Sequence, residues 1–225
     1  MGLFLMQKQF LMISDNLKLV NSRIESIQSD QDVQLIAVSK TRSVLEIQEA
    51  FDAGQIHFGE NYLQESLEKV NYFKDSGLVW HFIGPIQSNK TALISENFDW
   101  VHSVDRFKIA KRLSDQRNPN LGKLNILVQV NIDKEKTKSG VFIDKVDEIV
   151  SEIISLPYIC LRGFMCIPKA ENSSDSFSKM KDLISNYPSL DTLSMGMSAD
   201  LEVAIQNGAN LVRVGTDIFG QRSYN

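Results

Sequence analysis

The sequence predicts a single α/β domain folded as a (β/α)8 TIM barrel. Eight short apolar segments alternate with segments whose apolar residues recur at helical spacing. The 225 residues suffice for one such barrel. No linker rich in glycine, serine and proline divides the chain, so we expect one domain over residues 1–225.

An extra amphipathic helix over residues 13–27 precedes the first predicted strand. Leu17, Val20 and Ile24 recur there at the spacing of one helix face. Residues 1–11 before it are apolar, but they are too few to span a bilayer. We treat them as an extension of unknown role.

The first strand is predicted over residues 34–39. Its four consecutive aliphatic residues suit a strand buried on both faces, as in a parallel sheet. Ser43 and Glu46 then form a capping-box pattern that predicts a helix start. That helix runs to residue 53, and Gly54 is expected to close it in a left-handed conformation.

The same alternation continues to the end of the chain. An open doubly wound sheet would alternate in the same way, but eight units and no dinucleotide-binding fingerprint favour the barrel. The remaining strands are predicted over residues 55–59, 78–83, 100–103, 124–132, 159–167, 192–195 and 211–214, with helices over 62–74, 88–96, 106–116, 144–155, 173–186 and 200–207.

Composition argues against several classes of function. The net charge of −4 gives no basic field for nucleic acid or an anionic membrane. The two cysteines, Cys160 and Cys166, form no disulfide framework, and no two of the three histidines have metal-binding spacing. We therefore expect no metal, and a reducing, cytoplasmic setting.

Lys40 is the first candidate for chemistry. It follows the first buried strand, and the carboxyl ends of barrel strands face the active site. Desolvation there would lower the pKa of the amine and make it a nucleophile toward carbonyl groups. A lysine that extends from a strand end into water is the alternative for this stretch taken alone.

The last two strand ends predict a phosphate site. Gly196 and the hydroxyl of Ser198 follow the strand over 192–195, and Gly215 and Thr216 follow the last strand. Glycines let backbone amides approach an anion, and barrels commonly hold phosphate after strands seven and eight. Turn glycines and a serine N-cap would explain either stretch alone.

Arg213 is predicted to lie inside the barrel. It alternates with Val212 and Val214 in the last strand, so its side chain points to the opposite face. A buried guanidinium needs a partner, and a neutral aromatic nitrogen would supply one. A Schiff-base lysine, a phosphate cup and an arginine together describe a pyridoxal phosphate site.

The motifs on these strand ends resemble those of pyridoxal phosphate homeostasis proteins, the stand-alone relatives of the alanine racemase N-terminal domain. The resemblance extends from about residue 12 to residue 222. The motifs are AVSKT at 37–41, FGENY at 58–62, WHFIGPIQSNK at 80–90, KSG at 138–140, RGFM at 162–165, LSMGMS at 193–198 and RVGTDIFG at 213–220.

The resemblance implies a fold type III barrel that holds pyridoxal 5'-phosphate (PLP) as an internal aldimine on Lys40. Ser198, Gly215 and Thr216 match the phosphate positions, and Arg213 matches the arginine that faces the pyridine nitrogen. Asn61, His81 and Met195 fall in motifs that line the pocket of such proteins. His81 would stack on the ring or hydrogen-bond near it; a core histidine satisfied by the backbone is the alternative.

The resemblance leaves two principal functions open. One is a non-catalytic carrier that holds PLP in PLP homeostasis and could pass it to PLP-dependent apo-enzymes. The other is an amino-acid racemase or related PLP enzyme with Lys40 as its only base. Related racemases add a second base from a C-terminal domain, for which a chain ending at Asn225 has no room. This favours the carrier, and a monomer, since the racemase's dimer contacts go with that domain.

A cofactor-free lysine aldolase is a third and weaker possibility. It would use Lys40 as a Schiff-base nucleophile. It would leave the arrangement of Arg213, Ser198 and Thr216 less well explained.

Overall fold

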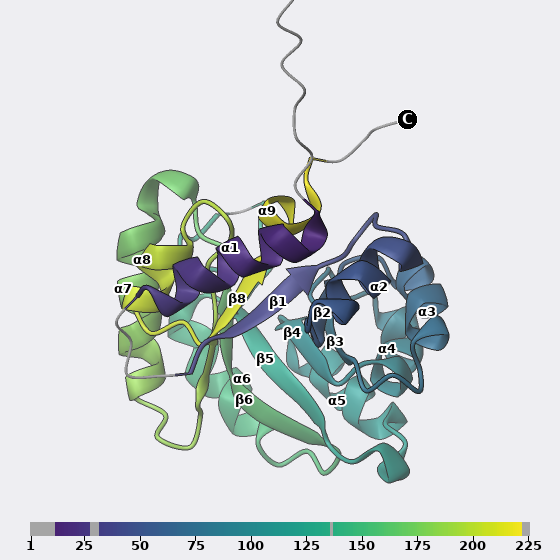
Figure 1. The fold of residues 1–225 in the computed structure, drawn as a ribbon. Helices are drawn as coiled ribbons and strands as arrows, with labels where there is room; N and C mark the ends of the chain where they lie inside the picture. Colours follow the sequence, from purple (N-terminus) through teal and green to yellow (C-terminus); the bar gives the residue numbers. More distant parts are fainter. Residues whose placement is uncertain (1–11, 28–31, 136, 222–225) are drawn as a thin grey trace, which may run out of the picture.

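The computed structural model describes residues 12–27, 32–135 and 137–221 (Figure 1). Its centre is a closed barrel of parallel strands in sequential order, as the alternation predicted. The strands are β1 (Gln34–Val38), β2 (His57–Glu60), β3 (Val79–Phe82), β4 (Trp100–Val104), β5 (Leu124–Val130), β6 (Ile159–Cys166), β7 (Thr192–Ser194) and β8 (Leu211–Val214).

The pairing of β1 with β8 closes the barrel. Gln34 lies opposite Leu211 and Ile36 lies opposite Arg213 in a parallel register. An open doubly wound sheet would leave two unpaired edges, so this closure excludes that alternative. The closed sheet brings the carboxyl ends of all eight strands to one end of the barrel.

Helices surround the barrel and connect its strands (Figure 1). The predicted helices over 88–96 and 144–155 begin with short 3-10 helices, Ser88–Lys90 and Ile143–Lys145. The 3-10 helices Pro119–Leu121 and Ala170–Asn172 and the short helix α9 are additions to the predicted elements. The helices are α1 (Ile13–Glu25), α2 (Val44–Asp52), α3 (Leu63–Tyr72), α4 (Thr91–Asn97), α5 (Phe107–Gln116), α6 (Val146–Ile153), α7 (Ser173–Ser185), α8 (Leu201–Gln206) and α9 (Thr216–Phe219).

Two predicted helix signals are present as local structure. The Ser43 side chain accepts from the amide of Glu46, whose carboxylate accepts from the Ser43 amide, which is a complete capping box. Gly54 follows the end of α2 with φ of 95°, the left-handed conformation that glycine adopts without steric cost. The chain therefore turns sharply from α2 toward β2.

The buried apolar side chains of the described residues form two clusters. The larger one lies between the strands and the helices. A smaller one consists of Ile36, Leu127, Met165 and Leu211 with Trp100 packed against it. Its four buried members come from β1, β5, β6 and β8, so they meet across the interior of the barrel. This cluster fills part of the space below the carboxyl ends of the strands.

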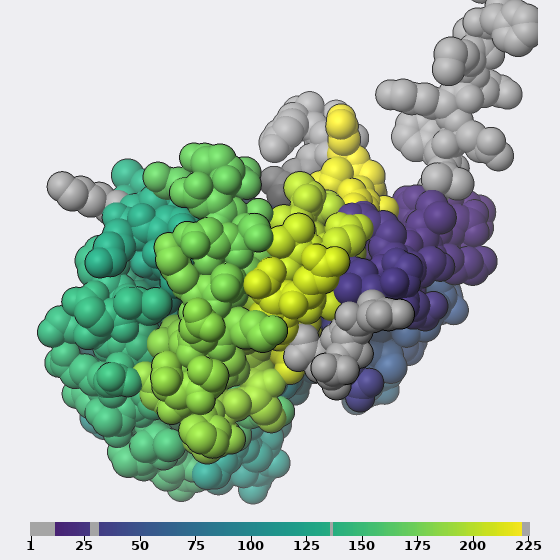
Figure 2. All heavy atoms as spheres, turned by 90° about the vertical axis from the view of Figure 1, so that its left-hand side faces the viewer, coloured from purple at the N-terminus to yellow at the C-terminus, as the bar shows by residue number. Residues whose placement is uncertain are grey.

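The extra N-terminal helix is confirmed as α1. It ends at Glu25, two residues before the predicted end, and buries Leu17, Val20 and Ile24. In Figure 2 α1 (purple) lies beside the yellow segment that contains β8 and α9. The extension over 1–11 lies outside the described residues. Helix α1 thus packs the beginning of the described chain against its end.

Candidate functional site

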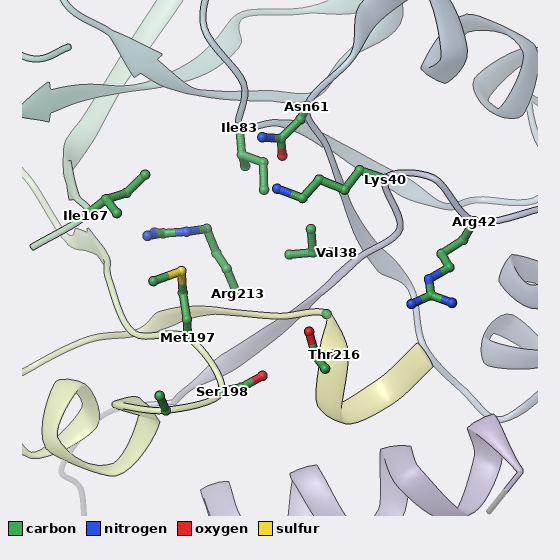
Figure 3. Close-up of a pocket in the computed structure, with 12 residues that line it drawn as sticks. Val38, Lys40, Arg42, Asn61, Ile83, Ile167, Met197, Ser198, Arg213 and Thr216 are labelled. Atoms are coloured by element: carbon green, nitrogen blue, oxygen red, sulfur yellow. The ribbon is translucent and has the colours of Figure 1, made fainter. Parts of the chain in front are cut away.

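A cavity of about 300 Å³ opens at the carboxyl ends of the strands, as predicted for a barrel site (Figure 3). Six of the eight predicted site residues line it. They come from the ends of β1, β2, β7 and β8, which lie far apart in the sequence. The six are Lys40, Asn61, Ser198, Arg213, Gly215 and Thr216.

Lys40 enters the cavity from the loop after β1. Figure 3 shows its side chain extended toward Asn61 and Ile83, with Arg213 on the other side of the cavity. Thr41 has φ of 64°, an uncommon conformation for a residue other than glycine. This turn separates the strand from α2 and leaves the lysine side chain directed into the cavity.

A group that we name the Lys69 cluster holds the backbone on both sides of Lys40. It consists of Ser39, Glu60, Glu65 and Lys69. The Lys69 ammonium donates to the Ser39 carbonyl at 2.8 Å, to Glu60 at 2.8 Å and to Glu65 at 2.5 Å. Glu60 accepts from the Ser39 hydroxyl at 2.6 Å, and Glu65 accepts from the amide that follows Lys40 at 2.6 Å.

Three members of the Lys69 cluster, Ser39, Glu60 and Lys69, are buried behind the strands, whereas Glu65 is partly exposed. Burial raises the pKa of Glu60, and the Lys69 charge and the hydrogen bonds from Lys69 and Ser39 oppose that rise. One carboxylate oxygen of Glu60, Oε2, has no hydrogen-bond partner among the described residues. Removal of one charge from a buried pair such as Glu60 and Lys69 leaves the other charge buried without a counter-charge, which destabilises the fold.

Arg213 lies inside the barrel, with 4% of its surface exposed. It donates to Ser194 Oγ at 2.5 Å and to the Cys166 carbonyl at 2.9 Å. Burial lowers its pKa, but an arginine keeps its charge. These two partners are neutral protein oxygens, and the guanidinium reaches the cavity with its charge intact.

Ser198, Gly215 and Thr216 form the opposite wall, which we name the β7–β8 cup. The hydroxyls of Ser198 and Thr216 lie on the same side of the cavity in Figure 3. A Cβ atom on Gly215 would lie 3.3 Å from the Val38 carbonyl oxygen, so only glycine fits without a shift. Gly196 has φ of 91° and turns the chain from β7 toward Ser198.

Arg23 of α1 connects the two loops of the β7–β8 cup from outside. Its guanidinium donates to Glu202 at 2.8 Å, to Asp217 at 2.7 Å and to the Ser198 carbonyl at 3.0 Å. The hydrogen bonds and charges of the two carboxylates raise the pKa of Arg23 despite its partial burial, and Arg23 lowers the pKa of Glu202. The predicted helix α1 therefore contributes a residue to the site that its apolar pattern did not indicate.

The structure places His81 and Met195 outside the lining of this cavity. Met195 is fully buried in the core that packs against the helices. His81 is fully buried between His57 and His102, with 2.9 Å from each of its ring nitrogens to a neighbouring ring nitrogen. His81 is thus a core histidine, but other histidines rather than the backbone are its partners.

The cavity is also lined by six residues that the sequence did not single out. Arg42 is the most notable, because its guanidinium donates to the Gly220 carbonyl at 2.5 Å and pairs with Glu46 at 3.2 Å. Its position two residues after Lys40, at the same strand end, was a signal that could have identified it. The six are Val38, Arg42, Ile83, Ile167, Met197 and Ala199.

The part of the chain that the structure describes contains no group of three or more histidine, cysteine, aspartate or glutamate side chains that could hold a metal ion. None of its helices is both long and apolar enough to cross a membrane. Cys160 and Cys166 are free thiols, and burial raises the pKa of Cys166 to about 12.

Comparison with known proteins gives the same fold and names a family. The family model described as "Alanine racemase, N-terminal domain" matches residues 12–223. The "Pyridoxal phosphate homeostasis protein" of Escherichia coli K12 is 44% identical over 231 residues, which cover 94% of this chain and 97% of that protein.

Two solved structures show how far the likeness extends. PipY of Synechococcus elongatus PCC7942, solved with PLP bound, has 34% identity and a TM-score of 0.81, and the match covers 92% of this chain and all of PipY. Alanine racemase from Corynebacterium glutamicum has 15% identity and a TM-score of 0.70, and the match covers 95% of this chain and 62% of that chain. The second likeness shows the fold alone. By sequence and fold, the chain belongs to the family of the alanine racemase N-terminal domain.

Proposed function

We propose that this protein binds PLP and acts in PLP homeostasis, holding the cofactor without efficient catalysis. The observation that carries the proposal is the cavity in which the Lys40 amine, the Arg213 guanidinium and the hydroxyls of Ser198 and Thr216 meet. The name of the E. coli relative and the PLP bound to PipY support the same ligand.

The residues in the cavity fit the chemical groups of PLP. The Lys40 amine would condense with the aldehyde, forming a carbon–nitrogen bond and releasing water. Ser198, Gly215 and Thr216 would hold the phosphate through hydroxyl and backbone donors. Asn61 Oδ1 is buried without a partner among the described residues and would accept a hydrogen bond from the ligand. A cavity of about 300 Å³ is large enough for a small cofactor.

Arg213 is the reason to expect a carrier rather than an efficient enzyme. PLP supplies an aldehyde for reversible capture and, when its pyridine nitrogen is protonated, an electron sink for catalysis. The charged guanidinium beside that nitrogen would disfavour its protonation. The guanidinium donates to a hydroxyl and a carbonyl, and neither of them neutralises its charge.

The remaining parts of the proposal concern the setting of the protein. It would act as a monomer in the cytoplasm and deliver PLP to apo-enzymes that depend on it. The two free thiols, Cys160 and Cys166, are consistent with a reducing compartment. His81 and Met195, which lie outside the cavity lining, would support the PLP site from the surrounding core.

Reduction with borohydride followed by mass spectrometry tests the covalent link. Borohydride converts the bond between lysine and aldehyde into a stable amine, so wild type incubated with PLP should carry one pyridoxyl group on Lys40. Lys40→Ala should carry none at the site. Lys145→Ala, which removes an exposed lysine on a 3-10 helix, should behave as wild type. A full adduct on Lys40→Ala would contradict the assignment.

Amino-acid turnover separates the carrier from the racemase. Purified protein saturated with PLP should racemise amino acids no faster than Lys40→Ala with the same added PLP. Turnover at ordinary enzyme rates, about 1 per second or more, that is lost in Lys40→Ala would establish the enzyme instead.

A further inference from the structure

All three histidines of the chain lie in one hydrogen-bonded row inside the barrel. His57 Nδ1 lies 2.9 Å from His81 Nε2, and His81 Nδ1 lies 2.9 Å from His102 Nε2. His102 Nδ1 lies 2.9 Å from Ser194 Oγ, which also accepts from Arg213 at 2.5 Å. The row crosses β2, β3, β4, β7 and β8, and it ends at a side chain that lines the cavity.

The Arg213 guanidinium determines which group donates and which accepts in each hydrogen bond of this row. Arg213 can only donate, so Ser194 Oγ accepts from it and has its own proton to give to His102 Nδ1. His102 then carries its proton on Nε2 and donates to His81 Nδ1. His81 in turn donates from Nε2 to His57 Nδ1. All three rings therefore have the same tautomer, with the proton on Nε2.

The opposite direction would leave a proton unsatisfied. If His102 donated from Nδ1, Ser194 Oγ would accept twice and its own proton would need another acceptor. The hydrogen bonds of the described residues give that oxygen two partners, His102 and Arg213. An unsatisfied hydroxyl in a buried site is unfavourable, so the first direction is favoured.

The environment of the row keeps its rings neutral and in place. His81 and His102 are fully buried, and burial lowers the pKa of both well below the ordinary 6.5, with further lowering by neighbouring histidines and Arg213. A neutral imidazole has one donor and one acceptor nitrogen, which each place in the row requires. The Trp100 ring stacks on His81 with 5.6 Å between centroids and an angle of 16°.

From this arrangement we infer that His81 and His102, acting through Ser194, are positioning residues for Arg213. The row fixes which oxygen lone pair the guanidinium meets and so fixes the plane that it presents to the cavity. The inference rests on the proposed function, because the group that Arg213 would face there is the ring nitrogen of PLP. It gives His81, which does not line the cavity, an indirect role in the site.

Nitrogen NMR of the cofactor-free protein, with ¹⁵N-labelled histidine, tests the row itself. The chemical shifts of Nδ1 and Nε2 distinguish the two tautomers and the charged ring. All three histidines should be neutral and carry the proton on Nε2. A proton on Nδ1 of His81 or His102, or a charged ring in either at neutral pH, would overturn the inference whether or not PLP binds.

Ser194→Ala tests the link from the row to the site. The variant should bind PLP about tenfold more weakly, as the loss of one hydrogen bond to a charged group predicts. The absorption spectrum of the bound PLP should also shift, because the arginine beside the ring nitrogen changes orientation. Ser95→Ala removes an equally buried hydroxyl from α4, where its partner is the Ala92 carbonyl, and should change neither quantity.

The outcomes separate this inference from the proposed function. Normal tautomers with an unchanged PLP spectrum and affinity in Ser194→Ala would overturn the positioning role and leave PLP binding intact. Equal changes in Ser95→Ala would show a general loss of packing and would overturn it too. Wild type that binds no PLP would overturn the proposed function, and the positioning role with it.

Discussion

The two walls of the cavity are held in place in different ways. Behind Lys40 lies the Lys69 cluster, in which the Lys69 side chain is 5% exposed and the Glu60 side chain is fully buried. Behind the β7–β8 cup lies Arg23, whose side chain is 35% exposed and pairs with half-exposed carboxylates. Buried charges depend strongly on one another, whereas exposed ion pairs contribute little. The Lys40 wall should therefore be rigid and intolerant of change, and the β7–β8 cup should be more adaptable.

Lys69→Met should have the largest effect on stability. It leaves the Glu60 carboxylate buried without its counter-charge, which costs about 3–5 kcal/mol of the free energy of unfolding. Urea denaturation followed by circular dichroism measures the loss. The double variant with Glu60→Gln removes both charges and should recover much of the stability. A single variant as stable as wild type would show that the wall does not depend on this pair.

Lower pH should restore part of the stability that Lys69→Met loses. Burial raises the pKa of Glu60 in the folded protein, and removal of Lys69 raises it further. The folded state then binds a proton that the unfolded state releases above its ordinary pKa of 4.5. Between the pKa of Glu60 in the folded variant and its lower, but still raised, pKa in the folded wild type, falling pH should restore at most about 1.4 kcal/mol per pH unit to the variant relative to wild type. If the difference in free energy of unfolding between variant and wild type stayed constant with pH, the loss of stability could not be assigned to the Glu60 carboxylate.

Gly196→Ala tests the backbone turn on the other wall. Its φ of 91° is strained for alanine, and the added Cβ would lie 2.6 Å from the Cβ of Ala204. Gly54→Ala is a matched control, with φ of 95° and no atom within 4 Å of the added Cβ. Gly196→Ala should cost about 1–3 kcal/mol more than Gly54→Ala in urea denaturation, because overpacking adds to the strain. Equal losses of unfolding free energy in the two variants would show that the β7–β8 cup can shift to accommodate the added methyl group.

Arg23→Ala should have the smallest effect on stability and still affect the site. The loss of exposed ion pairs costs about 1 kcal/mol or less, but the loops that carry Ser198 and Thr216 lose their common partner. PLP affinity, measured by absorbance titration, should fall several-fold. Arg106→Ala breaks another exposed pair, with Asp105, and should leave PLP affinity unchanged. Equal PLP affinities in the two variants would show that α1 does not support the cup.

The stability losses of Arg23→Ala and Lys69→Met should decline over different pH ranges. Arg23 lowers the pKa of Glu202 below the ordinary 4.5, so this contribution is present above pH 4.5 and is lost as pH falls through the lowered pKa. The small cost of Arg23→Ala should therefore persist down to that range. The cost of Lys69→Met should already decline at higher pH.

The sequence predicts the barrel and most of the cavity because both depend on local patterns. Runs such as residues 35–38 identify buried strands, and in a parallel barrel each strand end leads to the same face. Lys40, Arg213 and Thr216 could thus be brought together without knowledge of any contact. The prediction works where position along a strand determines position in space.

The supporting residues could not be predicted in this way. Arg23 reaches Glu202 across 179 positions of the sequence, and His102 reaches Ser194 across 92. Each contact depends on the closed barrel and on side-chain directions that the apolar pattern leaves open. His81 illustrates the limit, because its motif suggested the pocket whereas its ring lies within the histidine row.

The Arg23 contacts also have a consequence for the order of events during synthesis. Helix α1 is synthesised long before its partners, because Glu202 and Asp217 are among the last described residues to be made. The barrel likewise cannot close until β8 has been made, because β8 pairs with β1. Domains are synthesised from the amino end at about 5–20 residues per second, so a nascent chain has a lysine but no finished cup. PLP binding that uses the β7–β8 cup therefore requires residues near the end of the described chain.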